Sequence, residues 1–367
     1  MSTSKTERIS GLDIIRIVSM FLVILVHFLG MGGVIAAVQS PALKTVFCMI
    51  QGVSLCCVNL FALSTGFLHY GRKPHISSLF QLCLQGFFWI TAATLAFAII
   101  QKDMTIFESN FKDCIHLLSK RQYWYLTDYA VLFFLIPLLN AAVEKLSLKN
   151  LTFVISGIFF AVSLFPTVFP YVDPVSRGYS AVWLAVMYVI GAYIKKYDII
   201  NKLKVLPCFL VFVIFAALEG TYSLLSYNLG NGLKDYYYKF TSYNCVFVVG
   251  ASIMLFIILA QINIKSGGVK NVLKAVSSVA FSVYLIHCAP LIFDNYIVSK
   301  MSFVSSHGFF GSIAMLLGSA AAVFAAGTVL GLLQDGLFRL IRIPKFFRFI
   351  ENKINLCYDS VYKRFFA

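Results

Sequence analysis

Long apolar runs separated by short polar segments dominate the chain. Ten runs are long enough to cross about 30 Å of hydrocarbon as helices. They lie at approximately 12–36, 45–68, 79–101, 123–143, 150–170, 178–194, 205–227, 239–262, 273–298 and 308–338. The pattern predicts an all-α membrane protein, a bundle of about ten transmembrane helices around a central polar cavity.

Composition excludes a soluble globular protein. Hydrophobic residues make up 60% of the chain, charged residues 12%, and the mean hydropathy is +0.85, whereas soluble domains have about a quarter charged residues. The first run has no small-residue cleavage site, so we expect it to stay in the mature protein. We predict one transmembrane domain at 1–338, a basic amphipathic cytoplasmic tail at 339–367, and no appended soluble domain.

The loop charges predict the orientation. With the amino terminus in the cytoplasm, 21 Lys and Arg residues lie on that side and 9 on the other, together all 30. This split follows the positive-inside rule and places both termini in the cytoplasm. The net charge of +15 is spread over short loops, so nucleic acid is not an expected partner. The tail interleaves Phe with cations, which suits a helix lying on anionic membrane lipids.

The first run carries a polar stripe where charge is least expected. Asp13, Arg16, Met20, Val23 and His27 are spaced by three and four residues, so they share one helix face. At helical rise, Arg16 lies about 16 Å from His27, and a ligand spanning both would be long and anionic at the Arg16 end. Alternatively, Asp13 and Arg16 anchor the helix at the membrane surface and His27 packs. An ionisable group inside a membrane span favours a functional role.

This stripe resembles the start of the acyltransferase-3 family, whose signature is an Arg and a His separated by ten residues behind a Leu-Asp pair. Leu12, Asp13, Arg16 and His27 match it. Further similar segments follow in the expected order: VNLFALSTGF at 58–67, QYWYL at 122–126 with Pro137 and Asn140, YVIGAYIK at 188–195, and SVYLIH at 282–287. Where many members have Arg-x-x-Arg after the second helix, this chain has only Arg72 and Lys73. We also expect none of the carboxy-terminal hydrolase-like domain that some members carry.

The resemblance implies a membrane O-acyltransferase, and an O-acetyltransferase in particular. Its donor would be cytoplasmic acetyl-CoA or another acyl-CoA, and its acceptor a hydroxyl of a surface polysaccharide or lipid-linked glycan precursor. The implied location is the bacterial plasma membrane. The alternative is an ion-coupled transporter or flippase, because buried His and Glu also suit proton-coupled movement of a substrate. A scaffold subunit without chemistry is a third possibility, and the oligomeric state is left open.

Three titratable residues are candidates for catalysis: His27, Glu219 and His287. Each lies 13 to 15 residues from the predicted cytoplasmic end of its run, or about 20 Å at helical rise, so the three would share one depth. His27 would act as general base toward the acceptor hydroxyl or would itself carry the acyl group; both routes stay open. The alternative for Glu219 is a protonated acid bonded to a neighbouring helix, and for His287 a structural hydrogen bond.

Basic residues near the predicted cytoplasmic surface are candidates for the donor site. Arg16, Arg72 and Lys73 would bind the phosphates of the acyl carrier, and guanidinium groups suit phosphate because they present paired donors. The alternative for Arg72 and Lys73 is ordinary positive-inside charge.

Residues on the predicted outer side are candidates for the acceptor site. Trp124, Tyr125 and Asp128 would contact the sugar, although aromatic residues at this depth also form the interfacial belt of membrane proteins. We expect no metal, because the chain has neither Cys-x-x-Cys nor His-Glu-x-x-His spacing, and we expect most cysteines to pack as small apolar residues. In the last run, small residues recur every four positions at Ala314, Gly318, Ala322 and Ala326, with Gly327 and Gly331 beyond, and predict a helix-packing face.

Overall fold

The computed structural model describes residues 9–169, 172–229 and 241–366, and every regular element in these ranges is helical. Eight helical stretches are long and apolar enough to cross a membrane. They are Ser10–Met31, Pro41–His69, Ile76–Ile100, Trp124–Lys145, Leu148–Val168, Val205–Asn228, Gly267–His287 and Gly308–Leu340. The prediction of an all-α membrane bundle is confirmed.

Several stretches consist of more than one helix. The amino-terminal half contains α1 (Ser10–Val26), the π-helical turn η1 (His27–Met31), α2 (Val34–Ala37), α3 (Pro41–Ser54), α4 (Cys56–His69), α5 (Ile76–Ile100), α6 (Thr105–Ile115), α7 (Trp124–Lys145), α8 (Leu148–Phe159), η2 (Phe160–Leu164) and α9 (Phe165–Val168). The remainder contains η3 (Ser176–Gly178), α10 (Ala181–Lys196), α11 (Ile199–Lys202), α12 (Val205–Leu229), α14 (Val246–Ala260), α15 (Gly267–Ser278), α16 (Ala280–His287), α17 (Pro290–Tyr296), η5 (Ser302–Ser306), α18 (Gly308–Leu340) and α19 (Ile343–Phe366).

The predicted sixth and eighth runs correspond to the two shorter helices α10 and α14. They have 16 and 15 residues, or about 24 and 22 Å at helical rise, less than the hydrocarbon thickness. Both pack against α4, which is itself buried over most of its length. Each nevertheless joins an outer-end turn to an inner-end one, α10 between Arg177 and Lys195 and α14 between Tyr243 and Gln261, so both run from one end of the bundle to the other.

The predicted ninth run, 273–298, is interrupted. The helical stretch starts earlier, at Gly267, and α16 ends at His287. Pro290 then opens α17 at its first turn, because proline has no N–H to continue the preceding helix and its fixed φ suits a helix start. The break leaves the side chains of His287 and Cys288 at the end of a helix inside the bundle.

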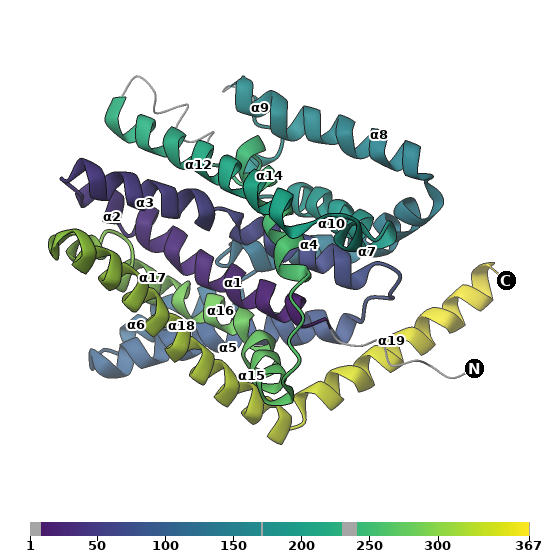
Figure 1. The fold of residues 1–367 in the computed structure, drawn as a ribbon. Coiled ribbons are helices and arrows are strands. Elements are labelled where there is room, and N and C mark those ends of the chain that lie inside the picture. Colours follow the sequence, from purple (N-terminus) through teal and green to yellow (C-terminus); the bar gives the residue numbers. More distant parts are fainter. Residues whose placement is uncertain (1–8, 170–171, 230–240, 367) are drawn as a thin grey trace.

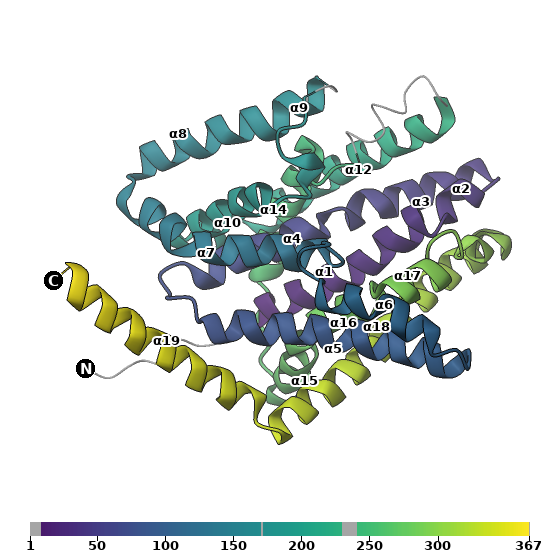
Figure 2. The same cartoon turned by 180° about the vertical axis from the view of Figure 1, so that it is seen from behind.

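Helix α1 lies at the centre of the bundle. It packs against α4, α3 and α14 on one side and α15, α16 and α18 on the other, and Figure 1 shows it between these two groups. Helix α8 lies at the margin in both views (Figures 1 and 2), and its Phe153 side chain is 79% exposed. The central position of α1 makes its polar stripe face protein rather than lipid.

Contacts between loops define two ends of the bundle. At the inner end, Asp13 accepts a hydrogen bond from Ser277, and Gln261 donates to the Leu203 carbonyl. At the outer end, the Tyr243 N–H donates to the Arg177 carbonyl. Segments predicted to lie on one side of the membrane therefore meet one another, as the alternating helix directions require. The assignment of the inner end to the cytoplasm stays a prediction.

Helix α19 is docked at the inner end through one buried carboxylate. Glu351 accepts hydrogen bonds from the Ser77 hydroxyl at 2.7 Å, the His75 ring at 3.2 Å and the Ile76 N–H at 3.2 Å. Burial alone would raise the pKa of Glu351, but these hydrogen bonds outweigh it and lower the pKa. A carboxylate at the start of α5 also suits the positive end of that helix dipole.

The predicted small-residue face of the last run is only partly correct. Gly327 and Gly331 pack closely against Val283 and Ser282 of α16. Four other members of the predicted face, Ala314, Gly318, Ala322 and Ala326, are exposed. The four-residue spacing does place these residues on one face of α18, but that face points outward. The helix packs on α16 through the adjacent face, which carries Gly327 and Gly331.

Close packing of α4 on α10 depends on glycine. A Cβ at Gly66 would overlap the backbone carbonyl of Tyr188, and one at Gly191 would overlap that of Leu63. We expect Gly66→Ala to lower the free energy of unfolding by about 1–3 kcal/mol, because the helices must move apart. Gly157 in α8 has no atom within 4 Å of such a Cβ, so Gly157→Ala is the matched control and should change stability by less than about 1 kcal/mol. Equal melting temperatures of the two variants in detergent would contradict this packing.

Candidate active site

Two histidines from distant segments meet at the centre of the bundle. The Nδ1 atom of His27 lies 3.1 Å from Nε2 of His287. His27 begins the π-helical turn η1, where the Gly32 N–H donates to the His27 carbonyl at 2.7 Å. Single π-helical turns are rare and occur frequently at functional sites. His287 is the last residue of α16 and is buried.

The hydrogen bonds of this pair define the tautomers of the two neutral rings. His287 Nδ1 lies 2.6 Å from the Val283 carbonyl, which can only accept, so this nitrogen carries the hydrogen. Nε2 of His287 is then the acceptor, and Nδ1 of His27 must donate to it. The assignment leaves the Nε2 lone pair of His27 available to take a proton.

His27 lines a wide cavity at the outer end of the bundle. The cavity has a volume of about 620 Å³ and is lined by polar residues, among them Gln51, Gln122 and Arg177, together with several aromatic rings. Trp124, Tyr179 and Tyr243 form one wall, with ring centroids 4.6 Å apart for Trp124 and Tyr179 and 4.9 Å apart for Tyr179 and Tyr243. Aromatic faces beside polar groups suit a sugar.

His27 also lines a second, much narrower cavity. It holds about 20 Å³ and is bordered by Met20 and Val23 of α1, Phe61 of α4, Tyr125 of α7 and other apolar residues. This volume has room for little more than one water molecule. The two cavities share His27, Trp124, Tyr243 and Tyr284, so His27 lies where they meet.

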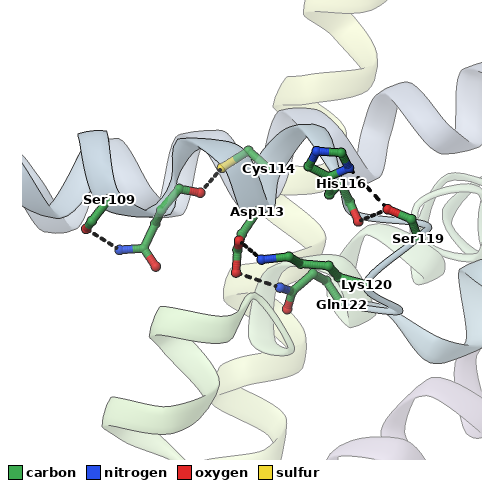
Figure 3. Close-up of polar contacts among 8 residues, drawn as sticks. Ser109, Asp113, Cys114, His116, Ser119, Lys120 and Gln122 are labelled. Carbon is green, nitrogen blue, oxygen red and sulfur yellow. Dashed lines mark hydrogen bonds and ion pairs between the residues drawn. The ribbon is translucent and has the colours of Figure 1, made fainter.

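Polar contacts hold the walls of the outer cavity in place. The Asn59 side chain of α4 donates to the Tyr243 carbonyl at 2.8 Å and accepts from Trp183 Nε1 at 2.9 Å. Figure 3 shows how α6 fixes the turn before α7: Asp113 accepts from Lys120 at 2.5 Å and from Gln122 at 3.1 Å. The Gln122 side chain is therefore held by Asp113.

Positive charge gathers at the inner end of α1. Arg16, Arg72 and Lys195 each lie within electrostatic range of the His69 imidazole. Lys195 donates to the Tyr70 carbonyl at 3.0 Å. We call Arg16, Arg72 and Lys195 the cation cluster. It lies at the end of α1 opposite His27, about 16 Å away at helical rise.

Asn140 positions the turn that carries Arg72. Its amide donates to the carbonyls of His69 at 3.1 Å and Arg72 at 3.4 Å, and it accepts from the Tyr188 hydroxyl at 2.8 Å. Tyr70, in the same turn, donates to Glu144. Burial and this hydrogen bond raise the pKa of Tyr70 to about 12, so it stays a donor at neutral pH.

Three predicted site residues lie away from these features. Glu219 is fully buried, and one of its oxygens faces the Cys245 thiol at 3.5 Å; the other makes no hydrogen bond in the part of the chain that the structure describes. Asp128 is paired with Arg121 at 2.6 Å and is not among the residues that line either cavity. Lys73 is exposed. Their predicted roles stay predictions.

The structure adds residues that sequence reasoning did not place in the site. Cys288 lies 3.6 Å from His27 Nδ1 and lines the outer cavity, although we had expected the cysteines to pack. Arg177 lines the same cavity, and Lys195 joins the cation cluster. No local motif marked Arg177, whereas Lys195 ends one of the segments that resemble the family.

Comparison with known families gives one match. The acyltransferase-3 family model, described as an acyltransferase domain, matches residues 9–332. No curated protein and no solved structure matches the chain. The matched range includes α1, the histidine pair, both cavities and the cation cluster.

Proposed function

Because this chain belongs to the acyltransferase-3 family of membrane acyltransferases, we propose that it transfers an acetyl group from cytoplasmic acetyl-CoA to a hydroxyl of a cell-surface glycan or of its lipid-linked precursor. The observation that carries the proposal is the position of His27. It lies where a narrow apolar cavity meets a wide polar one, with the cation cluster at the other end of its helix.

The donor enters from the inner end in this proposal. Arg16, Arg72 and Lys195 bind the phosphates of coenzyme A, since charge-assisted hydrogen bonds from guanidinium groups favour phosphate. The thioester arm then follows α1 past Met20 and Val23 to His27. Coenzyme A thioesters are anionic at one end and reactive at the other. This matches α1, which has the cation cluster at one end and His27 at the other.

The chemistry uses the free Nε2 of His27 as a general base. It takes the proton of the acceptor hydroxyl as the oxygen attacks the thioester carbonyl. The tetrahedral intermediate collapses, the carbon–sulfur bond breaks, and the coenzyme A thiolate takes the proton from His27. His287 accepts from His27 Nδ1 throughout, so it holds the ring and stabilises the imidazolium.

We expect no acyl-enzyme in this direct route. When labelled acetyl-CoA is supplied without an acceptor and the reaction is quenched, protein-bound label should stay at the level of the His27→Ala variant. Stoichiometric label on His27, located by mass spectrometry of its peptide, would instead establish that His27 carries the acyl group.

The narrow cavity supports acetyl as the transferred group. We expect Phe61→Ala to widen it and to raise the ratio of kcat/KM for butyryl-CoA to that for acetyl-CoA by about tenfold or more, because each methylene contributes about 1–3 kcal/mol in such a pocket. Phe21→Ala is the matched control, since Phe21 packs on Phe324 outside both cavities. An unchanged ratio in Phe61→Ala would show that the narrow cavity does not hold the acyl chain.

The acceptor would occupy the outer cavity, where the rings of Trp124, Tyr179 and Tyr243 face a sugar-sized space. The proposed location is the bacterial plasma membrane, with the wide cavity directed away from the cytoplasm. The test is the acetyl content of surface glycans in cells with and without the gene, and in cells that carry His27→Ala. The proposal requires a loss of ester-linked acetate in both deficient strains; equal acetate in all three would refute it.

A further inference from the structure

The histidine pair and a neighbouring cysteine are three side chains of the kind that bind zinc. They are His27 at the start of η1, His287 at the end of α16, and Cys288 next to it. His27 Nδ1 lies 3.1 Å from His287 Nε2 and 3.6 Å from Cys288 Sγ, and all three ligand atoms lie within 4.8 Å of one another.

These spacings are close to those around a tetrahedral zinc ion. Bonds of about 2.05 Å to nitrogen and about 2.3 Å to sulfur place two nitrogens about 3.3 Å apart and a nitrogen and a sulfur about 3.6 Å apart. The two shortest ligand distances therefore differ from the zinc geometry by a few tenths of an ångström. The third pair, His287 Nε2 and Cys288 Sγ, lies within 4.8 Å, so closure around an ion brings these two atoms together by up to about 1.2 Å.

The surroundings of His287 independently suit a metal ligand. A histidine that binds a metal through one nitrogen almost always donates its other N–H to a carbonyl or carboxylate, which orients the ring. His287 makes such a bond from Nδ1 to the Val283 carbonyl at 2.6 Å, and its Nε2 lies 3.1 Å from His27 Nδ1. The helix break before Pro290 lets the adjacent side chains of His287 and Cys288 approach one point.

The cluster is accessible from the outer end. His27 and Cys288 both line the cavity of about 620 Å³, so an ion held by the three side chains can keep water from that cavity as a fourth ligand. Such a site, with three protein ligands and one open position, differs from a closed structural zinc centre.

We propose that His27, His287 and Cys288 form a zinc site that is filled from the outer side and inhibits the enzyme. On binding, the Cys288 thiol loses its proton to solvent, and the His27 proton moves from Nδ1 to Nε2 because Nδ1 now bonds the ion. Nε2 then has no lone pair to accept a proton. The inhibition rests on the proposed role of His27, whereas the binding site does not, and the ion is an inhibitor rather than a cofactor.

Cobalt titration tests the site directly. The full chain is purified in detergent with a tag that contains no histidine, stripped with chelator and titrated with Co²⁺, whose bond to a thiolate gives a near-ultraviolet charge-transfer band. We expect one ion per chain and displacement by Zn²⁺. Cys288→Ser and His287→Ala should each raise the Kd at least about tenfold, whereas Cys357→Ser, which changes an exposed cysteine of the tail, should retain the wild-type Kd and absorption band.

A second measurement keeps the test decisive if the variants misfold. In the wild-type protein, Zn²⁺ should slow alkylation of Cys288 by iodoacetamide at least about tenfold, measured by mass spectrometry of its peptide. Unchanged alkylation, or metal binding that survives both ligand substitutions, would refute the site. Acetyl-CoA consumption that continues with zinc bound would instead refute the inhibition and the role of His27 while leaving the site intact.

Discussion

Replacing His27 with alanine should lower acyl transfer by about 10²- to 10⁴-fold, the usual contribution of a positioned general base. Binding of coenzyme A should persist, because its phosphates meet the cation cluster about 16 Å away along α1. The two effects are measured separately, as the initial rate of coenzyme A thiol release and as the rise in melting temperature when coenzyme A is added.

The control for His27 is another histidine, on the predicted outer side of the bundle. His116 is exposed and its ring contacts Ser119 within the same turn (Figure 3), so His116→Ala should retain the wild-type rate. If His27→Ala transfers acyl groups normally, His27 is not the base. If it loses the melting transition altogether, His27 serves packing.

Replacing Arg16 with lysine should weaken coenzyme A binding by about 1.5–3 kcal/mol, or about 10- to 150-fold in Kd, because lysine keeps the charge but loses the paired donors. Arg16→Ala should abolish transfer at cellular donor concentrations. The Kd is measured by titration of the purified protein. Arg339→Lys is the matched control. Arg339 is largely exposed and pairs with Asp335, four residues earlier on α18.

A shortened donor separates phosphate binding from general damage. Acetylpantetheine lacks the phosphates, so Arg16→Lys and the wild type should use it with the same kcat/KM. Wild-type affinity for coenzyme A in Arg16→Lys would show that Arg16 only anchors α1 at the surface. An equal loss with both donors would show that the substitution disturbs the catalytic centre.

Much of the fold could be predicted because the bilayer constrains it strongly. Apolar runs of membrane length must be helices, and the alternation of their directions determines which loops meet. Helix length was less predictable: α10 and α14 have only 16 and 15 residues and pack against the buried helix α4. The break after His287 follows from Pro290, which begins α17.

Depth along the helices located only part of the site. His27 and His287 were predicted at one level and are in contact, whereas Glu219 was predicted at the same level and faces Cys245. The depth of a residue gives its position along the membrane normal only. Whether two side chains meet also depends on the rotation of each helix and on which helices are neighbours. Those depend on packing between distant segments, such as Gly66 of α4 against α10, which no single segment encodes.

The contribution of Cys288 was hidden for a different reason. A cysteine in an apolar run is usually a packing residue, and its metal-binding partners are more than 250 residues away or immediately adjacent. Only the helix break brings Cys288 and His287 to the same point as His27. Arg177 was likewise outside any motif, and its place in the outer cavity depends on the contact between its turn and Tyr243.

The central claim is tested most directly by thioester consumption with no ion gradient. Purified wild-type protein in detergent is given labelled acetyl-CoA, with water as a poor substitute for the sugar hydroxyl. We predict slow, continuous release of acetate and coenzyme A in equal amounts, absent in His27→Ala. A wild-type protein that never consumes the thioester, but moves a glycan precursor across liposome membranes, would contradict the account.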